Sequence, residues 1–235
     1  MFGNSRPVLA LIPARGGSKG VPRKNLALLR GRPLVEYTLR AARESSWVDA
    51  IYISSDDAQV LELGRTQGAL TLERPAAYAT DNASANEVVR HFIDSLSADL
   101  RARDPMIVYL QPTSPMRDAP HIDAALRMLA EQGGTLLVSV VELHKSPYKS
   151  FQLDESSRLK SLFDERLSNA RRQDLPRTFV PNGAIYVFAL TDFTSRGGFP
   201  SNGSLAYVMN ETDSIDVDAP EDLARAERIL GDRYG

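Results

Sequence analysis

Short apolar segments alternate with amphipathic segments along the first 141 residues. Five apolar runs have the length of buried strands: residues 8–12, 50–54, 69–72, 106–110 and 135–141. Between these runs, apolar residues recur at helical spacing. Four residues precede the helical patterns and suit a first turn or an N-cap: Pro33, Asp56, Ser84 and Asp118. Ser84 and Glu87 also have the spacing of a capping box. This alternation predicts an α/β fold with a mostly parallel sheet.

Residues 142–181 interrupt the alternation. The segment is polar and charged, has weak periodicity and contains three prolines (Pro147, Pro176 and Pro181). A structureless loop of this length is unusual inside a compact domain. We therefore expect a subdomain or an arm that packs on another chain. Beyond it, the pattern predicts strands at residues 183–188, 206–209 and 214–218, followed by a final helix.

A loop rich in glycine and cations follows the first predicted strand. It contains three glycines and four basic residues: Gly16, Gly17, Gly20, Arg15, Lys19, Arg23 and Lys24. Glycine lets backbone N–H groups approach an anion closely, and the cations add charge-assisted hydrogen bonds. The loop therefore favours a polyphosphate ligand over the alternative, a flexible surface turn with solvated charges. Its spacing matches neither the P-loop nor the dinucleotide-binding glycine motif.

Two carboxylates stand near the other end of the chain. In the predicted strand 214–218, Asp216 and Asp218 alternate and so point to the same face of the sheet. Two converging carboxylates suit Mg²⁺, which prefers one or two carboxylates completed by water and phosphate oxygens. Asp218 and Glu221 also have the spacing of an ordinary capping box, so spacing alone leaves both interpretations open.

Several motifs together resemble one enzyme family. Pro13-Ala-Arg-Gly-Gly-Ser-Lys-Gly-x-Pro-x-Lys-Asn25 closely resembles the opening signature of the N-acylneuraminate cytidylyltransferases (CMP-sialic acid synthetases) and their legionaminic and pseudaminic acid relatives. Further matches are Gln111-Pro-Thr-Ser-Pro-x-Arg117, Asn182-Gly-Ala-Ile-Tyr186 and Ser214-Ile-Asp-Val-Asp218. The resemblance implies a single domain with a Rossmann-like nucleotidyltransferase sheet, and a dimerisation subdomain at 142–181.

The resemblance also implies an activity. CTP would react with an acidic nine-carbon keto sugar to give a CMP-sugar and pyrophosphate, in a homodimer that uses Mg²⁺ or Mn²⁺. Motifs shared by the family do not distinguish N-acylneuraminic, legionaminic and pseudaminic acids. A nucleotide-binding regulatory module on the same fold is the alternative from another functional class.

Site residues follow from the same resemblance. Those expected to bind the nucleotide are Ala14, Arg15, Gly16, Gly17, Lys19, Asn25, Arg74, Asn82 and Ser84, and those expected to act in catalysis are Arg15, Lys19 and Lys24. Those expected to bind the sugar are Gln111, Thr113, Ser114, Lys149, Arg172, Asn182 and Tyr186, with Asp216 and Asp218 binding the metal. From the residues alone, the alternative to nucleotide binding is that Arg74 is a solvated cation and that Ser84 only caps its helix. Lys149 and Arg172 would likewise be solvated surface charges.

Composition narrows the functional classes. The 235 residues carry a formal net charge of −2 and no cysteine. This charge gives no electrostatic case for binding nucleic acid or a membrane. The absence of cysteine excludes a thiolate nucleophile and a metal site built from thiolates. No apolar run approaches the length of a membrane span, and residues 1–6 lack a signal-peptide core, so we expect a cytoplasmic protein.

Overall fold

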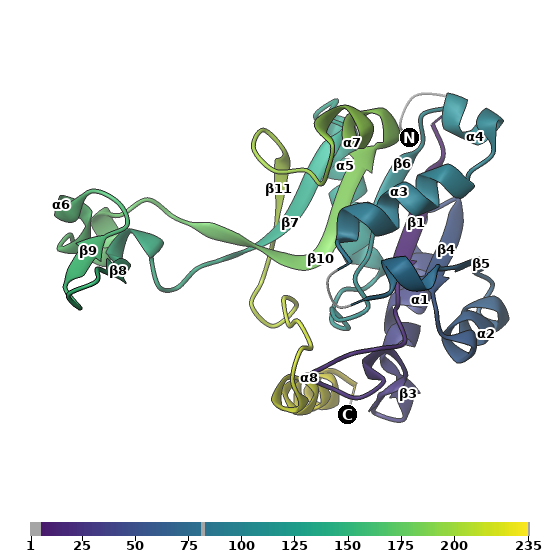
Figure 1. Cartoon of the computed structure of the whole chain (residues 1–235), viewed down its shortest axis with the longest axis horizontal. Coiled ribbons are helices and arrows are strands. Elements are labelled where there is room, and N and C mark those ends of the chain that lie inside the picture. Colours follow the sequence, from purple (N-terminus) through teal and green to yellow (C-terminus); the bar gives the residue numbers. More distant parts are fainter. Residues whose placement is uncertain (1–5, 81–82, 235) are drawn as a thin grey trace.

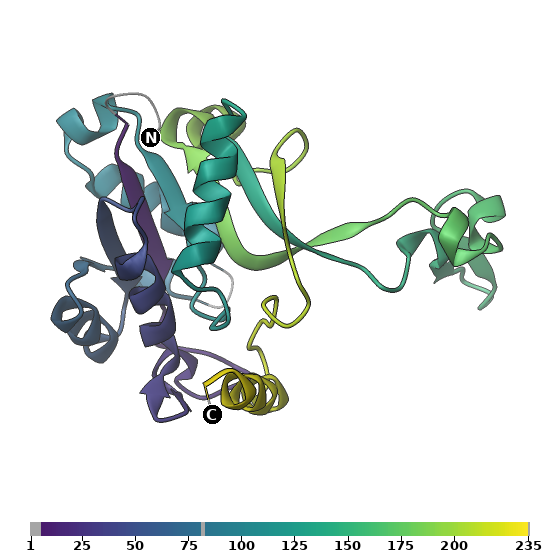
Figure 2. The same ribbon diagram turned by 180° about the vertical axis from the view of Figure 1, so that it is seen from behind.

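The computed structural model describes residues 6–80 and 83–234, which form a central sheet with helices on both faces (Figures 1 and 2). The sheet has the strand order β11-β7-β10-β6-β1-β4-β5. Its strands are β1 (Val8–Pro13), β4 (Ala50–Ser55), β5 (Leu70–Glu73), β6 (Met106–Tyr109), β7 (Leu136–Glu142), β10 (Phe179–Ala189) and β11 (Leu205–Met209). Every neighbouring pair is parallel except those of β10, which lies antiparallel between β6 and β7. The predicted mostly parallel α/β fold is confirmed.

Helices connect the strands and cover the sheet. Those described are α1 (Leu34–Glu44), α2 (Ala58–Thr66), α3 (Ala85–Ser95), α4 (Ala98–Ala102), α5 (Ala119–Glu131), α6 (Glu165–Ser168), α7 (Leu190–Arg196) and α8 (Pro220–Tyr234). A small hairpin of β2 (Leu28–Leu29) and β3 (Arg32–Pro33) precedes α1. Ser84 and Glu87 form the predicted capping box of α3. Asp118 caps α5 as predicted.

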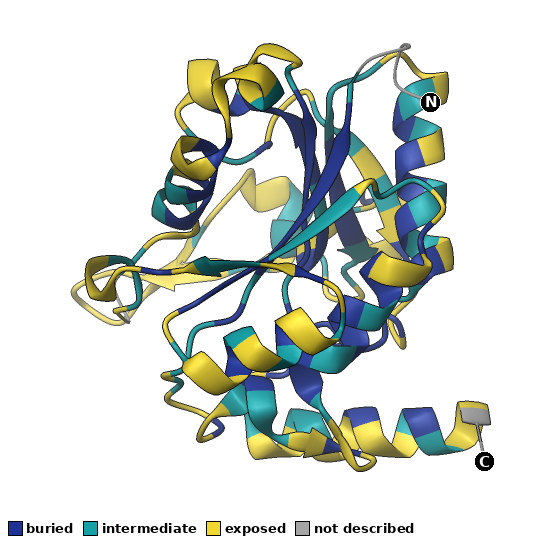
Figure 3. Ribbon diagram, turned by 90° about the vertical axis from the view of Figure 1, so that its right-hand side faces the viewer, coloured by how far each residue is buried: buried dark blue, intermediate teal, exposed yellow. Residues whose placement is uncertain are grey.

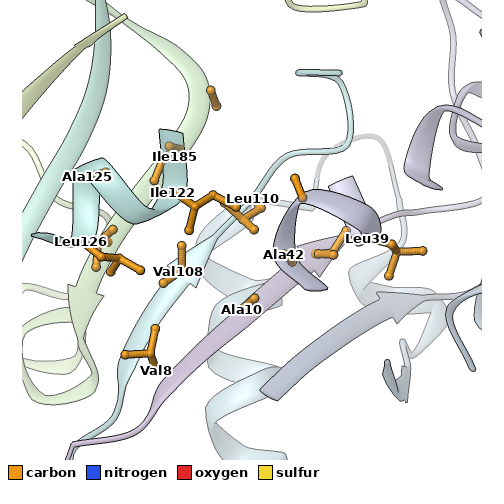
Figure 4. Close-up of a cluster of buried hydrophobic side chains, with 14 of the residues drawn as sticks. Val8, Ala10, Leu39, Ala42, Val108, Leu110, Ile122, Ala125, Leu126 and Ile185 are labelled. Carbon is orange, nitrogen blue, oxygen red and sulfur yellow. The ribbon is translucent and has the colours of Figure 1, made fainter. Parts of the chain in front are cut away.

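The core consists of one apolar layer on each face of the sheet. Along β1, Val8 and Ala10 pack with α1 and α5, whereas Leu9 and Leu11 pack with α3 and α7. Figure 4 shows the first layer, where Ile122 and other residues of α5 meet the sheet. Burial on both faces explains why the strands are continuous apolar runs. The exposed sides of the helices face outward (Figure 3).

The predicted strand at 214–218 is wrong. After β11 the chain turns at residues 210–213, where the Asp213 N–H donates to Asn210 Oδ1 (2.8 Å). Residues 214–218, called the acidic segment below, then run outside the sheet. The Val217 N–H donates to the Thr113 carbonyl (2.8 Å) instead of pairing with a strand. Ile215 and Val217 are buried in a third apolar cluster that joins α8 to the start of α1. Burial against α8, and not strand pairing, therefore holds the segment.

The final helix begins at Pro220, and the Asp222 side chain caps its N-terminus. Asp222 Oδ2 accepts hydrogen bonds from the N–H groups of Asp218 (3.1 Å) and Ala219 (2.8 Å). The Asp218 carboxylate is instead paired with Lys24. The geometry therefore gives the capping function to Asp222 and leaves the Asp218 carboxylate facing the loop that follows β1.

Residues 142–181, called the arm, project from the sheet at the end of a ribbon formed by β7 and β10 (Figures 1 and 2). The arm carries a hairpin of β8 (Phe151–Leu153) and β9 (Leu159–Ser161), followed by α6. Large apolar side chains are exposed on it: Phe151, Leu153, Leu159, Leu162, Phe163, Phe179 and Val180. In this chain alone, their surface is left in contact with water.

The N-cap of α2 is Asp57, and the prediction of Asp56 is wrong. Asp57 Oδ1 accepts the N–H groups of Gln59 (2.8 Å) and Val60 (3.3 Å). Its second oxygen pairs with Arg23 (2.9 Å). The Asp56 carboxylate points elsewhere and accepts the Gly16 N–H (2.7 Å). The neighbouring aspartates therefore divide two functions, a helix cap and a loop contact.

We expect Asp57→Ala to lower the free energy of unfolding by about 1 kcal/mol, because it removes an N-cap. Asp56→Ala keeps the cap and is the matched control in urea unfolding. Desolvation raises the pKa of Asp57, but hydrogen bonds from Arg23 and from two helical N–H groups outweigh it and hold the pKa below its usual value. The difference between wild type and Asp57→Ala should therefore persist at neutral pH and disappear as pH falls through that depressed pKa. A difference that grows in acid would contradict this assignment.

Candidate active site

A cavity of about 510 Å³ opens at the carboxyl ends of β1, β5 and β6. Open parallel sheets usually bind ligands at this edge. The residues that line it come from the loop after β1, the loop after β5, the start of α3, the end of β6 with the residues that follow it, and the acidic segment: Pro13, Arg15, Gly17, Ser18, Lys19, Gly20, Lys24, Asn25, Arg74, Tyr78, Thr80, Ala83, Ala85, Val88, Tyr109, Gln111, Pro112, Thr113 and Asp218. Most of the predicted nucleotide-binding residues thus meet in one cavity.

Hydrogen bonds fix the glycine–cation loop, residues 15–24. Asn25 is buried, and its Nδ2 donates to the Arg15 carbonyl (2.7 Å). Ser18 Oγ accepts the Lys24 N–H (3.0 Å). Arg15 Nη1 donates to the Thr80 carbonyl (3.1 Å), across the cavity mouth. The loop therefore has a defined shape, with the amide of Asn25 acting as an internal brace.

The same loop packs directly on the acidic segment. A Cβ atom on Gly20 would lie 2.0 Å from the Asp218 carbonyl oxygen, so a larger residue would separate the two backbones. Lys24 Nζ donates to the Val217 carbonyl and to Asp218 Oδ1, both at 2.9 Å. These contacts bring residues almost 200 positions apart in sequence to one wall of the cavity.

The cavity is electrostatically suited to a polyanion. Its lining carries four cations, Arg15, Lys19, Lys24 and Arg74, and one carboxylate, Asp218. Arg74 is buried and is held by the Ser54 carbonyl (Nη2 to O, 2.8 Å). Burial lowers the pKa of Arg74, and the charge of Asp56 opposes this shift. A guanidinium fixed in this way provides a rigid positive wall, because it cannot rotate without losing its hydrogen bonds.

Asp216 and Asp218 lie close enough for their charges to interact, although they are not on a strand. Desolvation by surrounding protein raises the pKa of Asp216, and the Asp218 charge adds to the rise. A hydrogen bond from Thr113 and the charge of Lys24 oppose it. Part of the Asp216 surface is still exposed, so a ligand can reach the carboxylate. Only Asp218 belongs to the cavity lining itself.

The donor set fits Mg²⁺ if substrate completes it. Among residues 6–80 and 83–234, no group of three or more histidine, cysteine, aspartate or glutamate side chains gathers as a metal site. Two carboxylates beside a cation-lined cavity are nonetheless what Mg²⁺ uses when phosphate oxygens and water fill its remaining positions. Asp216 and Asp218 would therefore hold the ion together with the bound nucleotide.

Five of the seven predicted sugar-binding residues lie outside the arm, and they fall into two groups. Gln111 and Thr113 line the cavity. Ser114 is fully buried outside that lining, and within the described part of the chain its hydroxyl has no hydrogen-bond partner. Asn182 is buried, with its amide bonded to protein groups. Tyr186 packs edge-on against Tyr109, and burial raises its pKa, with a further rise from Asp216.

The remaining predicted residues lie in three places. Lys149 and Arg172 belong to short 3₁₀ turns of the arm, which projects away from this chain's own cavity (Figure 1). Ser84 caps α3, and its hydroxyl also donates to Glu87 Oε2 (2.9 Å). Ala14 is buried behind the loop, and Asn82 lies outside the described residues. The structure thus brings together the nucleotide loop and the acids, but not the arm cations.

Sequence reasoning missed three residues near the cavity. Tyr109 forms part of its wall, and Asp56 holds the Gly16 N–H. Arg117 is buried and donates through Nη2 to Thr38 Oγ1 (2.9 Å) and to the Gln111 carbonyl (3.1 Å). Tyr109 ends β6, so its place at a strand's carboxyl end was a usable signal. Arg117 also had a signal, because it ends the Gln111–Arg117 motif. The contact of Asp56 with Gly16 depends on tertiary packing and had no signal in the sequence.

A family model described as Cytidylyltransferase matches residues 9–188, more than half of the chain. The chain therefore belongs to the cytidylyltransferase family. It is 32% identical, over 99% of its length, to the N-acylneuraminate cytidylyltransferase of Oncorhynchus mykiss, of which it covers 52%. It is 34% identical, over 94% of its length, to that of Escherichia coli O18:K1:H7, of which it also covers 52%. The resemblance inferred from the motifs is confirmed.

The chain spans about half the length of these curated relatives. Another relative, the pseudaminic acid cytidylyltransferase of Campylobacter jejuni, is 28% identical over 93% of this chain and 94% of its own length. The arrangement of elements is also that of two solved proteins. A CMP:2-keto-3-deoxy-manno-octonic acid synthetase complexed with CTP has a TM-score of 0.68 at 15% identity, covering 97% of this chain and 100% of its own. The 4-diphosphocytidyl-2C-methyl-D-erythritol synthase of Anaerococcus prevotii has a TM-score of 0.65 at 11% identity, covering 96% and 99%. These two show a shared fold.

None of the helices in residues 6–80 and 83–234 combines the length and apolarity that a membrane span requires.

Gly183 provides a test of how the site is shaped. Its φ is +77°, and a Cβ atom there would lie 2.4 Å from Gln111 Oε1. Gly31 has a similar φ of +78° but open space around its Cβ position. Alanine at either position should cost about 1–2 kcal/mol of unfolding free energy, because the left-handed region disfavours a side chain. Only Gly183→Ala should also reduce cytidylyl transfer, by displacing Gln111. Equal activity of both variants would show that the position of Gln111 is unimportant.

Proposed function

We propose that this chain transfers the cytidylyl group of CTP to an acidic nine-carbon keto sugar, giving a CMP-sugar and pyrophosphate. The observation that carries the proposal is the cavity itself, with four cations and one carboxylate in its lining, in a chain of the cytidylyltransferase family. Relatives named N-acylneuraminate and pseudaminic acid cytidylyltransferase support an acidic sugar as the acceptor. Legionaminic acid is a third acceptor of the same chemical type.

In this proposal the nucleotide triphosphate lies on the glycine–cation loop. Arg15, Lys19 and Lys24 neutralise the phosphate oxygens, and Gly17, which has open space at its Cβ position, allows a phosphate to approach the backbone. Arg74 and the loop after β5 form one side of the same cavity. We assign the cytidine to that side, since the polar loop offers backbone and side-chain groups to a base and a ribose.

The sugar's anomeric hydroxyl would attack the α-phosphorus in line with the departing pyrophosphate. Gln111 and Thr113 line the same cavity and would orient the sugar. Negative charge grows on the phosphate oxygens during the reaction, and the three loop cations would stabilise it. Asp216 and Asp218 would hold Mg²⁺, which adds positive charge at the phosphates. No covalent intermediate with the enzyme is required.

A panel of substrates tests this function. Pyrophosphate release should appear with CTP, a divalent cation and one of the three sugars, and should be far slower with UTP. The two bases differ at the 4-position and N3, so a site that hydrogen-bonds this edge leaves buried groups unpaired with the wrong base. Similar rates with UTP, ATP and CTP would overturn the cytidine assignment. CTP binding without turnover on any sugar would favour the regulatory-module alternative.

The acids can be tested separately from folding. We expect Asp216→Asn and Asp218→Asn to remove nearly all turnover while circular dichroism stays unchanged, because an amide is a much poorer ligand for Mg²⁺. Glu221→Gln is a matched control, since Glu221 is an exposed acid at the start of α8. It should keep full turnover. If Asp218→Asn lowers only the melting temperature, Asp218 is structural and the metal assignment is wrong.

We further propose that the working unit is a homodimer whose arms complete each other's sites. Exposed phenylalanine and leucine side chains on the arm favour burial against a second copy, since large exposed apolar patches mark interaction surfaces. Lys149 and Arg172 lie on the arm, away from the cavity of their own chain (Figure 1). If they contact an anionic sugar, that sugar is bound to the partner. A two-fold dimer is the commonest symmetric arrangement.

Complementation between inactive variants tests this arrangement. Arg15→Ala and Arg172→Ala should each be inactive alone. After subunit exchange, a mixed dimer would contain one site with both arginines intact and so up to half of the activity of a wild-type dimer. In an equal, randomly exchanged mixture about half of the dimers are mixed, so the mixture should recover about one quarter of wild-type activity. An active monomer in sedimentation would exclude the shared site. A stable, exchanged dimer with no recovered activity would place Arg172 in its own subunit's site or outside catalysis.

A further inference from the structure

The Asn182 side chain uses all of its hydrogen-bonding capacity inside the protein. Its Oδ1 accepts from Ser139 Oγ (2.6 Å) and from the Ala184 N–H (3.3 Å). Its Nδ2 donates to Ser214 Oγ (2.9 Å) and to Met209 Sδ (3.3 Å). A carboxamide has two acceptor sites and two donor hydrogens, so none remains for a ligand. Asn182 was predicted to bind the sugar, and this geometry instead suits a structural connector.

The two serines extend the connection on each side. Ser139 lies on β7, is fully buried, and accepts the Ile185 N–H of β10 (2.7 Å) while donating to Asn182. Ser214 accepts from Asn182 and donates to the Asn210 carbonyl (2.6 Å). The chain Ser139–Asn182–Ser214, called the amide relay, therefore joins β7 and β10 to the first residue of the acidic segment.

The relay lies where the sheet is irregular. The pairing of β10 with β7 shifts register between Pro181 and Tyr186, so the ladder leaves backbone groups unpaired around Asn182. The side chains of Ser139 and Asn182 accept two of these, the N–H groups of Ile185 and Ala184. Satisfying buried groups in this way fixes the shape of the irregularity. The neighbouring Gly183 approaches both Gln111 Oε1 and Asp216 Oδ2.

We propose that the amide relay is a positioning device that sets the acidic segment relative to Gln111. Ser214 stands two residues before Asp216, so a shift of its hydroxyl moves the first carboxylate of the pair. Segment 214–218 has no strand ladder. Burial against α8 and the hydrogen bond from Val217 to Thr113 hold its later residues, and the relay attaches its first residue to the sheet. The expected effect of the relay on metal binding rests on the proposed function of Asp216 and Asp218. Its expected effect on the order of residues 214–218 is independent of that function.

Serine deletions test the relay. Ser139→Ala and Ser214→Ala remove its two ends, and Ser204→Ala is the matched control. Ser204 precedes β11, and its buried hydroxyl has no hydrogen-bond partner within the described residues. Ser214 is half-buried, so water can replace its hydroxyl and the variant should fold. Two measurements apply: hydrogen exchange of a peptide covering residues 214–218, and Mn²⁺ affinity in the presence of CTP by electron paramagnetic resonance.

We expect each relay variant to exchange faster at 214–218 and to bind Mn²⁺ about 10-fold more weakly, the lower end of the usual loss when a partner of a metal ligand is removed. Ser204→Ala should match wild type in both. Because the serines act through the same amide, the double variant should lose less affinity than the product of the single losses. The relay would be overturned if both single variants kept wild-type hydrogen exchange and wild-type Mn²⁺ affinity. It would also be overturned if the loss of Mn²⁺ affinity in the double variant equalled the product of the two single losses.

The result separates the relay from the proposed function. If wild type releases no pyrophosphate with any sugar, the function fails, while exchange at 214–218 still decides whether the relay holds the segment. If the variants exchange faster but bind Mn²⁺ as tightly as wild type, the relay does not set the metal site, and the proposal is wrong in that part. Faster exchange together with weaker Mn²⁺ binding would support it in full.

Discussion

The position of β10 is the constraint on which the rest of the molecule depends. This strand enters the sheet between β6 and β7 and runs antiparallel to both. An antiparallel neighbour can share a continuous two-stranded ribbon with β7, and that ribbon carries the arm away from the sheet (Figure 1). The same strand places Gly183 against Gln111, a cavity-lining residue that follows β6. One reversed strand thus carries the projecting arm and supports a residue of the candidate site.

The opposite wall depends on contact between distant parts of the chain. The glycine–cation loop follows the first strand, and the acidic segment precedes the last helix. Gly20 lets their backbones touch, and Lys24 joins them through a carbonyl and a carboxylate. In the folded chain, the cations expected to neutralise phosphate and the acids expected to hold a metal therefore lie side by side. Neither set could form the proposed site alone.

Buried polar side chains hold the edges of this site. Arg117 is buried with a hydroxyl and backbone carbonyls as partners, including those of Gln111 and Ala184. Desolvation lowers its pKa to about 9, which the charge of Asp118 opposes. Burying a cation is costly unless hydrogen bonds compensate it. Arg117 donates to the Ala184 carbonyl in the irregular part of β10, and Asn182 joins the same part of β10 to Ser139 of β7. These buried polar contacts hold the backbone next to Gln111.

The sequence by itself determined the elements and the chemistry of the loops. Apolar runs located the strands, because strands buried on both faces are continuously apolar. The Ser84–Glu87 capping box and the cap at Asp118 could be predicted from the sequence, because capping depends on a few adjacent residues. The loop at 15–24 predicted phosphate chemistry from its composition, and its motif indicated the family. All of these signals are local.

Tertiary structure decided what the local signals left open. Packing on α8 took residues 214–218 out of the sheet, although their alternation is that of a strand. Of two adjacent aspartates, Asp56 accepts a hydrogen bond from the Gly16 N–H, and Asp57 is the N-cap of α2. Asn182 matches a ligand motif, yet partners from three other parts of the chain occupy its amide. Such choices depend on which groups distant segments bring within hydrogen-bond reach, and a single sequence does not contain those distances.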